Sequence, residues 1–399
     1  MKDEKKAPKL RFKGFTDDWE QCKLSDISEK SYEKNTDNKY STVLTNSAEY
    51  GIVKQRDFFD KDIANSSNIS GYYVVRKNYF VYNPRISNQA KFGPINRNKL
   101  DESGIMSPLY LVFTVHDIDE SFLETLFQTT TWHRFMYQNG DTGARADRFA
   151  IKDSTFMSMP IKVPSLEEQH KLALAFQKLD QTITLHEEKK RQLERLKSAL
   201  LQKMFADKSG YPPVRFEGFS DKWEQVKYGE IFQRRSKMGV STPTLPSVEY
   251  DDINPGMGTL NKEPKSKGIS KRGIYFNPGD VLFGKLRPYL KNWLFACFEG
   301  VAVGDFWVLT SSKIDHGFTY SLIQTPGFQY IANLSSGSKM PRSDWGLVSN
   351  ARTFIPINHL EQERISSVLF GLDHAITLYE HKLEILNKIK SFLLQNMFI

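Results

Sequence analysis

The sequence has little cysteine and no long apolar run. Its 399 residues include only two cysteines, Cys22 and Cys297, which lie in different halves and form neither a CxxC pair nor a Cys/His spacing. A disulfide framework and a structural zinc site are therefore not expected. No run of 18 apolar residues occurs, and the first ten residues, MKDEKKAPKL, lack the apolar segment of a signal peptide. We therefore expect a cytoplasmic protein with no membrane span.

Motifs of the enzymes that act on DNA are also missing. A DNA methyltransferase needs a glycine-rich loop and an NPPY-like motif, and neither YNPR from Tyr82 nor YPPV from Tyr211 fits. The GKL sequence at Gly284 lacks the spacing and the hydroxyl residue of a phosphate-binding loop. No metalloprotease, serine hydrolase or nuclease pattern stands out. These absences favour a binding protein with no catalytic residue, metal or cofactor of its own.

The composition is that of a folded protein with a mild basic excess. Hydrophobic residues make up 39% and aromatic residues 13% of the chain, enough for more than one buried core. The length suggests two or three domains. A formal net charge of +8 is compatible with nucleic-acid binding, but the excess is too small to establish it.

The chain repeats itself. Residues 8–27 and 212–231 are identical at 11 of 20 positions, including the pattern RFxGFxxxWEQ from Arg11 and from Arg215. Residues 168–205 and 361–398 align without a gap and match at 17 of 38 positions, from an initial EQ to LLQKMF and LLQNMF. A repeat near 200 residues is far too long for a solenoid and indicates a duplicated half-molecule.

The repeat predicts four parts. They are a first globular domain at 1–160, a central helix at 161–208, a second globular domain at 209–355 and a C-terminal helix at 356–399. Short β-like runs mixed with helical patterns near 119–138 and 317–334 indicate an α+β class for both domains. The middles, about 28–160 and 232–355, have diverged much more than the flanks. We interpret this divergence as a difference in function between the two middle segments, with neutral drift as the alternative.

Both long helices carry a heptad seam, with apolar residues at steps of three and four. A proline and acidic residues precede or begin each helix, as helix starts prefer. The seam, which we expect to form the helix–helix and subunit interface, consists of Leu172, Phe176, Leu179, Ile183, Leu193, Leu200 and Met204, and then of Ile365, Leu369, Leu372, Ile376, Tyr379, Leu383, Leu386, Ile389, Leu393 and Met397.

A helix of about 38 residues is roughly 57 Å long and cannot be buried by a small domain alone. Each seam is therefore expected to pair with the other, although pairing between two chains is an alternative. The first helix leads from domain one to domain two, so the second must run back. This predicts an antiparallel coiled coil and a pseudo-two-fold molecule. His186, Lys190 and Lys197 interrupt the first seam, and we expect looser packing there.

Basic residues gather in both domains. Residues 63–100 contain no acidic residue, and residues 262–291 hold eight basic residues against two acidic ones. Later in each domain, GDTGARADR from Gly140 and SSGSKMPRSDW from Ser335 place small residues beside two cations. Such side chains, interleaved with amides, suit phosphates and base edges, although an ordinary solvated face is the alternative. The candidate DNA-binding residues are Arg76, Lys77, Arg85, Asn88, Gln89, Lys91, Arg97, Arg145 and Arg148, and then Lys265, Lys267, Lys271, Arg272, Lys285, Arg287, Lys291, Lys339 and Arg342.

The repeated RFxGFxxxWEQ, the EQ-led helices and the LLQxMF endings resemble the specificity subunit of type I restriction-modification systems, over essentially the whole chain. The resemblance implies a bacterial or archaeal protein whose two domains each read half of a bipartite, asymmetric DNA site. It also implies helices that set the spacing and dock two modification subunits. Those subunits would carry S-adenosylmethionine, and restriction subunits would use ATP and Mg²⁺. Two alternatives remain open: a catalytic pseudo-dimeric nuclease, and a coiled-coil scaffold that does not bind DNA.

Overall fold

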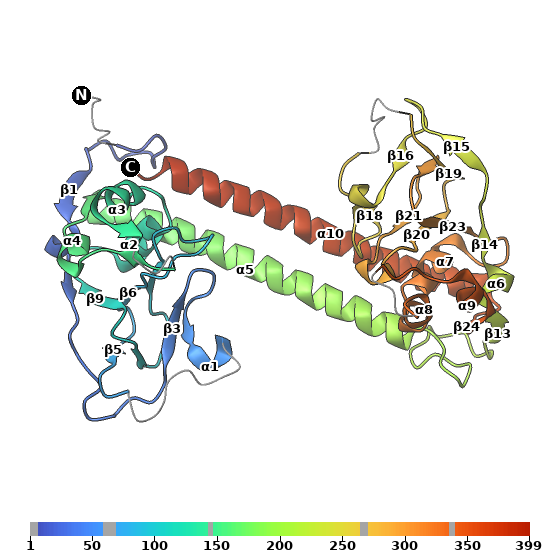
Figure 1. The fold of residues 1–399 in the computed structure, drawn as a ribbon, viewed down its shortest axis with the longest axis horizontal. Helices are drawn as coiled ribbons and strands as arrows, with labels where there is room; N and C mark the ends of the chain where they lie inside the picture. The colour runs from blue at the N-terminus through green and yellow to red at the C-terminus, as the bar shows by residue number, and fades with distance from the viewer. Residues whose placement is uncertain (1–6, 59–68, 143–146, 264–269, 335–339) are drawn as a thin grey trace. The chain divides into compact units, whose positions relative to one another are not determined.

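A computed structural model describes residues 7–58, 69–142, 147–263, 270–334 and 340–399. The chain forms two compact units (Figure 1). Unit 1 is Met1–Thr184 with Glu384–Ile399, and unit 2 is Leu185–Leu383. Each unit thus contains one of the two predicted globular domains and a part of both long helices. The domain limits predicted from the sequence, at residues 160, 208 and 355, stay predictions.

Unit 1 is built on a four-stranded antiparallel sheet in the order β2-β9-β6-β7. These strands are β2 Ser28–Lys30, β9 Leu111–Val115, β6 Phe80–Tyr82 and β7 Ile95–Arg97. The short pairs around it are β1 Glu20–Lys23 with β12 Pro160–Val163, β3 Leu44–Ser47 with β4 Gly51–Lys54, β5 Tyr73–Val75 with β8 Gly104–Met106, and β10 Asp141–Thr142 with β11 Phe149–Ala150. The helices are α1 Gln55–Phe58, α2 Glu120–Phe127, α3 His133–Asn139 and α4 Asp153–Met157.

Unit 2 repeats this plan around the sheet β14-β23-β20-β21. Its strands are β14 Gln233–Arg234, β23 Phe306–Thr310, β20 Val281–Gly284 and β21 Trp293–Phe295. A second sheet has the order β15 Met238–Val240, β19 Arg272–Phe276, β22 Gly300–Ala302 and β16 Ser247–Val248, and the remaining pairs are β13 Glu224–Lys227 with β24 Arg352–Ile355 and β17 Ile253–Asn254 with β18 Thr259–Leu260. The helices are α6 Tyr228–Ile231, α7 His316–Ile323, α8 Pro326–Ala332 and α9 Trp345–Asn350. The α+β class is confirmed.

The two long helices are α5, Leu166–Lys203, and α10, His359–Asn396, of 38 residues each. They pack antiparallel, as the direction of the chain predicted. In unit 1, Asp180 of α5 pairs with Lys390 of α10 at 2.8 Å. In unit 2, Lys190 pairs with Glu380 at 2.6 Å. The partner of a later residue on α5 is thus an earlier residue on α10. No helix in the described part of the chain is long and apolar enough to cross a bilayer.

The seam residues lie on the sheltered sides of these helices. Leu172, Phe176 and Ile183 are buried on α5, and most of the remaining seam residues are buried or half-buried. Ile389 differs, because 43% of it is exposed. The long helices are therefore amphipathic along the predicted stripe, with Ile389 at its edge.

The repeated Glu-Gln pair fastens each long helix to the globular domain that precedes it. Arg11 donates two hydrogen bonds of 2.7 Å to the Glu168 carboxylate, and Arg215 donates two of 2.7 and 2.9 Å to Glu361. Each carboxylate is only 1% exposed. A buried carboxylate needs a fixed cation, and the planar arginine fork meets both of its oxygens. The shared arginine of RFxGF and glutamate of EQ thus form one contact in each unit.

The glutamine beside each glutamate makes a second fastening. The Gln169 side chain accepts a hydrogen bond from the Asp119 amide at 2.9 Å and donates one to the Pro164 carbonyl at 2.8 Å. Asp119 caps the N-terminus of α2 by accepting from two of its amides. In unit 2 the same three roles belong to Gln362, Asp315 and Pro356. The glutamine of each EQ pair therefore orients a short helix of the domain through its capping aspartate, α2 in unit 1 and α7 in unit 2.

An aromatic triad buries the end of a long helix in each unit. In unit 1, Phe398 stacks on Phe122 with ring centroids 5.6 Å apart and meets Trp19 edge-on at 6.2 Å. The matching triad in unit 2 consists of Phe205, Phe318 and Trp223. The LLQxMF endings thus have a packing role, since each contributes the phenylalanine of one core.

The two ends of the described chain meet in unit 1 as two internal segments meet in unit 2. The Leu10 amide donates to the Asn396 carbonyl at 2.8 Å, and the Val214 amide donates to the Lys203 carbonyl at 2.8 Å. By the repeat, Leu10 corresponds to Val214 and Asn396 to Lys203. Figure 1 shows the C-terminus beside the elements of unit 1.

This equivalence predicts that a circular permutant folds. A short linker would join Ile399 to Lys9, and the chain would open near Ser209, in an exposed turn. Termini opened in exposed turns are tolerated when the backbone pairing is kept. We expect circular dichroism and the thermal midpoint to match those of the natural order. A control permutant opened inside β20 should not fold, and an insoluble first permutant would contradict the prediction.

Candidate nucleic-acid interface

Two predicted basic segments of domain one are brought together at the loop between β6 and β7. The Ile86 amide donates to the Asp147 carbonyl at 3.0 Å, and the Phe149 amide donates to the Pro84 carbonyl at 2.8 Å. These two bonds flank a bridge between Arg85 and Arg148. Residues separated by about 60 positions therefore share one edge, which sequence spacing alone did not indicate.

Domain two has the same junction at the loop between β20 and β21. The Arg287 amide donates to the Pro341 carbonyl at 2.7 Å, and the Ser343 amide donates to the Lys285 carbonyl at 2.8 Å. The bridge here joins Leu286 to Arg342. Because these two loops follow equivalent strands of equivalent sheets, we name them hairpin loop 1 (83–94) and hairpin loop 2 (285–292).

The side chains of hairpin loop 1 are mostly exposed. Arg85 lies 4.0 Å from the Asp147 carboxylate, and its side chain is 69% exposed. Asn88, Gln89 and Lys91 are also exposed. Among the described residues, no carboxylate pairs with Lys91, so this ammonium group is available to a phosphate.

Hairpin loop 2 is more tightly built. Lys285 and Arg342 share the Asp305 carboxylate, at 3.6 and 2.9 Å. Arg287 and Lys291 have φ values of +48° and +59°, a left-handed conformation that costs residues other than glycine about 1–2 kcal/mol each. Neither has a carboxylate partner in the described part of the chain. Strain of this kind persists only where the surroundings impose it.

Other candidate residues lie beside carboxylates. Arg76 pairs with Glu33 at 2.5 Å and Lys77 with Asp101 at 2.6 Å, both on the surface. Lys271 pairs with Glu249 at 2.7 Å. The two surface pairs are weak and can exchange for phosphate, whereas the Lys271–Glu249 pair is half-buried, with side chains 32% and 28% exposed.

Arg97 is more buried than the residues of those surface pairs, whereas Arg272 is exposed. The Arg97 side chain is 11% exposed and bonds Glu120 and Glu124 of α2, so it holds the sheet to that helix. Arg272 is exposed at the start of β19, away from hairpin loop 2 in sequence. Four candidates, Arg145, Lys265, Lys267 and Lys339, lie outside the described residues.

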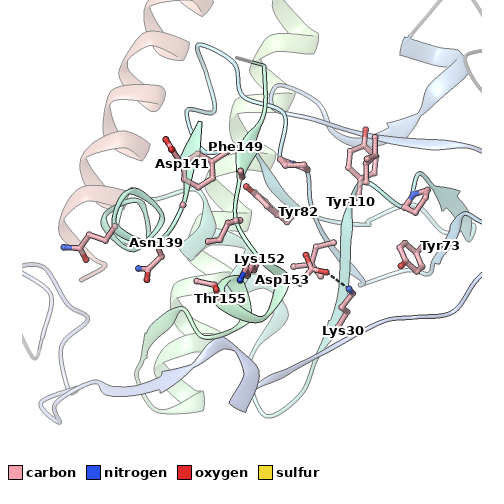
Figure 2. A pocket seen from close by; sticks show the side chains of 18 residues that line it. Lys30, Tyr73, Tyr82, Tyr110, Asn139, Asp141, Phe149, Lys152, Asp153 and Thr155 are labelled. Carbon is pink, nitrogen blue, oxygen red and sulfur yellow. Dashed lines mark hydrogen bonds and ion pairs between the residues drawn. The ribbon is translucent and has the colours of Figure 1, made fainter. Parts of the chain in front are cut away.

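A cavity of about 840 Å³ lies beside hairpin loop 1 (Figure 2). Its lining includes Tyr82, Tyr110, Phe149 and the ion-paired Lys30 and Asp153. The Tyr82 hydroxyl donates to the Phe92 carbonyl at 2.9 Å, and burial raises the pKa of this phenol, so it remains a neutral donor. Lys30 and Lys152 also line this cavity, and the sequence did not indicate them because neither belongs to a basic cluster. Lys30 lies on β2 of the sheet, and its ion pair with Asp153 places it in the same cavity lining as Lys152.

The chain is similar to known proteins in sequence and in fold. Residues 16–195 match the type I restriction modification DNA specificity domain. The chain is 22% identical, over 318 residues, to the type I restriction enzyme MjaVIII specificity subunit of Methanocaldococcus jannaschii, covering 73% of this chain and 70% of that protein. It shares its fold with the S subunit of a type I restriction-modification system from M. genitalium, with a TM-score of 0.62, 14% identity and coverage of 98% and 99% of the two chains.

In this chain, each unit has an Arg–Glu fork, a glutamine bonded to the aspartate that caps the helix, and an aromatic triad. A specificity subunit is the non-catalytic component of its complex, so the nuclease alternative is not retained. The chain is therefore similar to specificity subunits of type I restriction-modification systems, by a family match over residues 16–195 and by a fold shared over nearly its whole length.

Proposed function

We propose that domains 1–160 and 209–355 each read one half of a bipartite, asymmetric site on double-stranded DNA. The observation that carries this proposal is the hairpin-loop junction, which occurs once in each domain with the same backbone bonds and different exposed side chains. A common frame with different surface residues suits two readers of different sequences. Cations at the loops bind phosphates, and the amide or aromatic groups between them face base edges.

The long helices, 161–208 and 356–399, would set the spacing between the half-sites and dock two modification subunits. A rigid pair of helices can act as a ruler, because protein spacing fixes half-site spacing. The modification subunits would bring S-adenosylmethionine, and restriction subunits would bring ATP and Mg²⁺. Exposed apolar residues on α10, such as Ile385 and Phe392, suit contact with another helix.

Exchange of one domain tests this proposal. Residues 28–160 would be replaced by the counterpart from a relative with a known DNA site, which keeps the repeated frame. We expect one half of the recognised sequence to change and the other half to persist. The measurement is the position of methylated adenines in a host that carries the complete system. A change in both halves would show that the domains do not read independently.

The basic residues of the hairpin loops predict a salt-dependent affinity. Alanine at Arg85, Lys91, Lys285 or Arg287 removes one phosphate contact, so each variant should bind DNA more weakly and flatten the salt slope by about one unit. Gel shifts at several salt concentrations measure both effects. Lys388→Ala is the control, since this lysine pairs with Glu384 on the exposed side of α10. Unchanged slopes in all four variants would remove the loops from the interface.

A further inference from the structure

The tips of the two hairpin loops carry different kinds of exposed side chain. In hairpin loop 2, the short turn Pro288–Leu290 exposes 54% of Tyr289 and 44% of Leu290. In hairpin loop 1, the corresponding tip exposes Asn88 and Gln89. Single exposed apolar residues are common on proteins, but two adjacent ones at the tip of a clamped turn need a further reason.

The tip of hairpin loop 2 is held rigidly while its side chains stay in solvent. Left-handed residues stand on both sides of it, and Pro288 at its start is buried. The Gly256 amide donates to the Lys291 carbonyl at 2.8 Å, which joins the turn to the β17–β18 hairpin. Tyr289 and Leu290 are thus presented in a fixed place.

The surroundings of this tip indicate the occupant. Lys285, Arg287, Lys291 and Arg342 surround it in the sequence and at the junction, and only Asp305 pairs with any of them among the described residues. An apolar tip between cations suits the major groove, where phosphates flank the base edges. The thymine methyl group is the apolar feature of that groove, and adenine presents the donor and acceptor pair that asparagine and glutamine match.

We propose that the hairpin-loop tips determine sequence specificity, with Tyr289 and Leu290 contacting thymine in one half-site and Asn88 and Gln89 contacting adenine in the other. This inference rests on the proposed function and adds the base class that each domain reads. The cations on either side position the loop on phosphates. The tip side chains then distinguish one base pair from another.

The test uses the full chain and a randomised duplex library. Bound duplexes are selected and sequenced for the natural chain, for Tyr289→Ala/Leu290→Ala and for Asn88→Ala/Gln89→Ala. We expect the first variant to lose preference for a T·A pair in one half-site and to bind the selected sequence about tenfold more weakly. The second should lose preference for adenine in the other half. Neither should change the affinity for random DNA or its salt slope.

Controls separate this inference from the proposed function and from misfolding. Leu347→Ala removes a leucine of α9 that is 51% exposed, against 44% for Leu290, and should leave the selected sequence unchanged. Circular dichroism verifies folding, and Tyr289→Ser provides a milder second variant. If the natural chain selects no sequence, the proposed function fails. If it selects a sequence that the tip variants also select, or if the variants lose affinity equally for all DNA, the tips do not read bases.

Discussion

Replacing Arg11 with methionine is expected to destabilise unit 1 by about 3–5 kcal/mol, the cost of leaving a buried charge without its partner. The Glu168 carboxylate is 1% exposed and accepts both Arg11 hydrogen bonds. Methionine fills a similar volume but offers no donor, so the carboxylate would stay buried without a cation. Urea unfolding of the full chain, followed by circular dichroism, measures the loss. Hydrogen exchange assigns it to unit 1.

The repeat supplies a matched variant. Arg215→Met removes the same fork in unit 2, but the Trp223 indole also donates to Glu361, at 3.3 Å, whereas the Trp19 indole nitrogen has no hydrogen-bond partner in the described part of the chain. One remaining donor to a charged group retains about 1.5–3 kcal/mol, so Arg215→Met should cost less than Arg11→Met. Equal costs would show that the Trp223 bond contributes nothing. A cost below about 1 kcal/mol for Arg11→Met would contradict the role of the fork.

The frame of this protein could be predicted because it is duplicated. Each element of the frame places several residues at fixed positions, so RFxGFxxxWEQ and the EQ-led helices stand out when the chain is aligned with itself. The antiparallel course of α5 and α10 followed from the direction of the chain. The contacts that hold this frame together could not be predicted from the sequence, because Arg11 and Glu168 are 157 positions apart and no local pattern relates them.

The candidate interface could be predicted only in part. A local excess of cations marks hairpin loop 1, but it does not distinguish Lys91, which has no partner among the described residues, from Arg97, which lies between two carboxylates of α2. Those carboxylates come from a segment more than 20 positions away. The pairing of each hairpin loop with a later basic segment likewise depends on strand order.

The polar residues of the first seam illustrate the same limit. His186, Lys190 and Lys197 predicted looser packing, yet each meets a residue of α10. His186 lies against the Tyr379 ring at 5.4 Å, and Lys190 pairs with Glu380. The seam thus contains polar contacts across the helices, and Lys197 makes the most buried of the ion pairs that join α5 to α10 in the described part of the chain, with Asp373.

Removing one partner of the Lys197–Asp373 pair is expected to cost unit 2 about 3–5 kcal/mol. The two side chains are 11% and 10% exposed, so Lys197→Met or Asp373→Asn leaves the other group buried and unpaired. Replacing both, as Lys197→Met/Asp373→Leu, should be neutral or stabilise by about 1–4 kcal/mol. Urea unfolding measured by tryptophan fluorescence suits this test, because Trp223, Trp293, Trp307 and Trp345 all lie in unit 2.

The repeat again provides the control, because Asp180 and Lys390 occupy the equivalent positions in unit 1. Their side chains are 40% and 24% exposed, so Asp180→Asn or Lys390→Met should cost only about 0–1 kcal/mol.

The pH dependence of stability gives a second check on the Lys197–Asp373 pair. Burial raises the pKa of Asp373, so its folded state binds a proton more tightly than its unfolded state. The penalty of an unpaired Asp373 in Lys197→Met, relative to Lys197→Met/Asp373→Asn, should therefore shrink as the pH falls from 7 toward 5. A penalty that grows on acidification, or equal costs for the two ion pairs, would show that burial does not set the energy of these contacts.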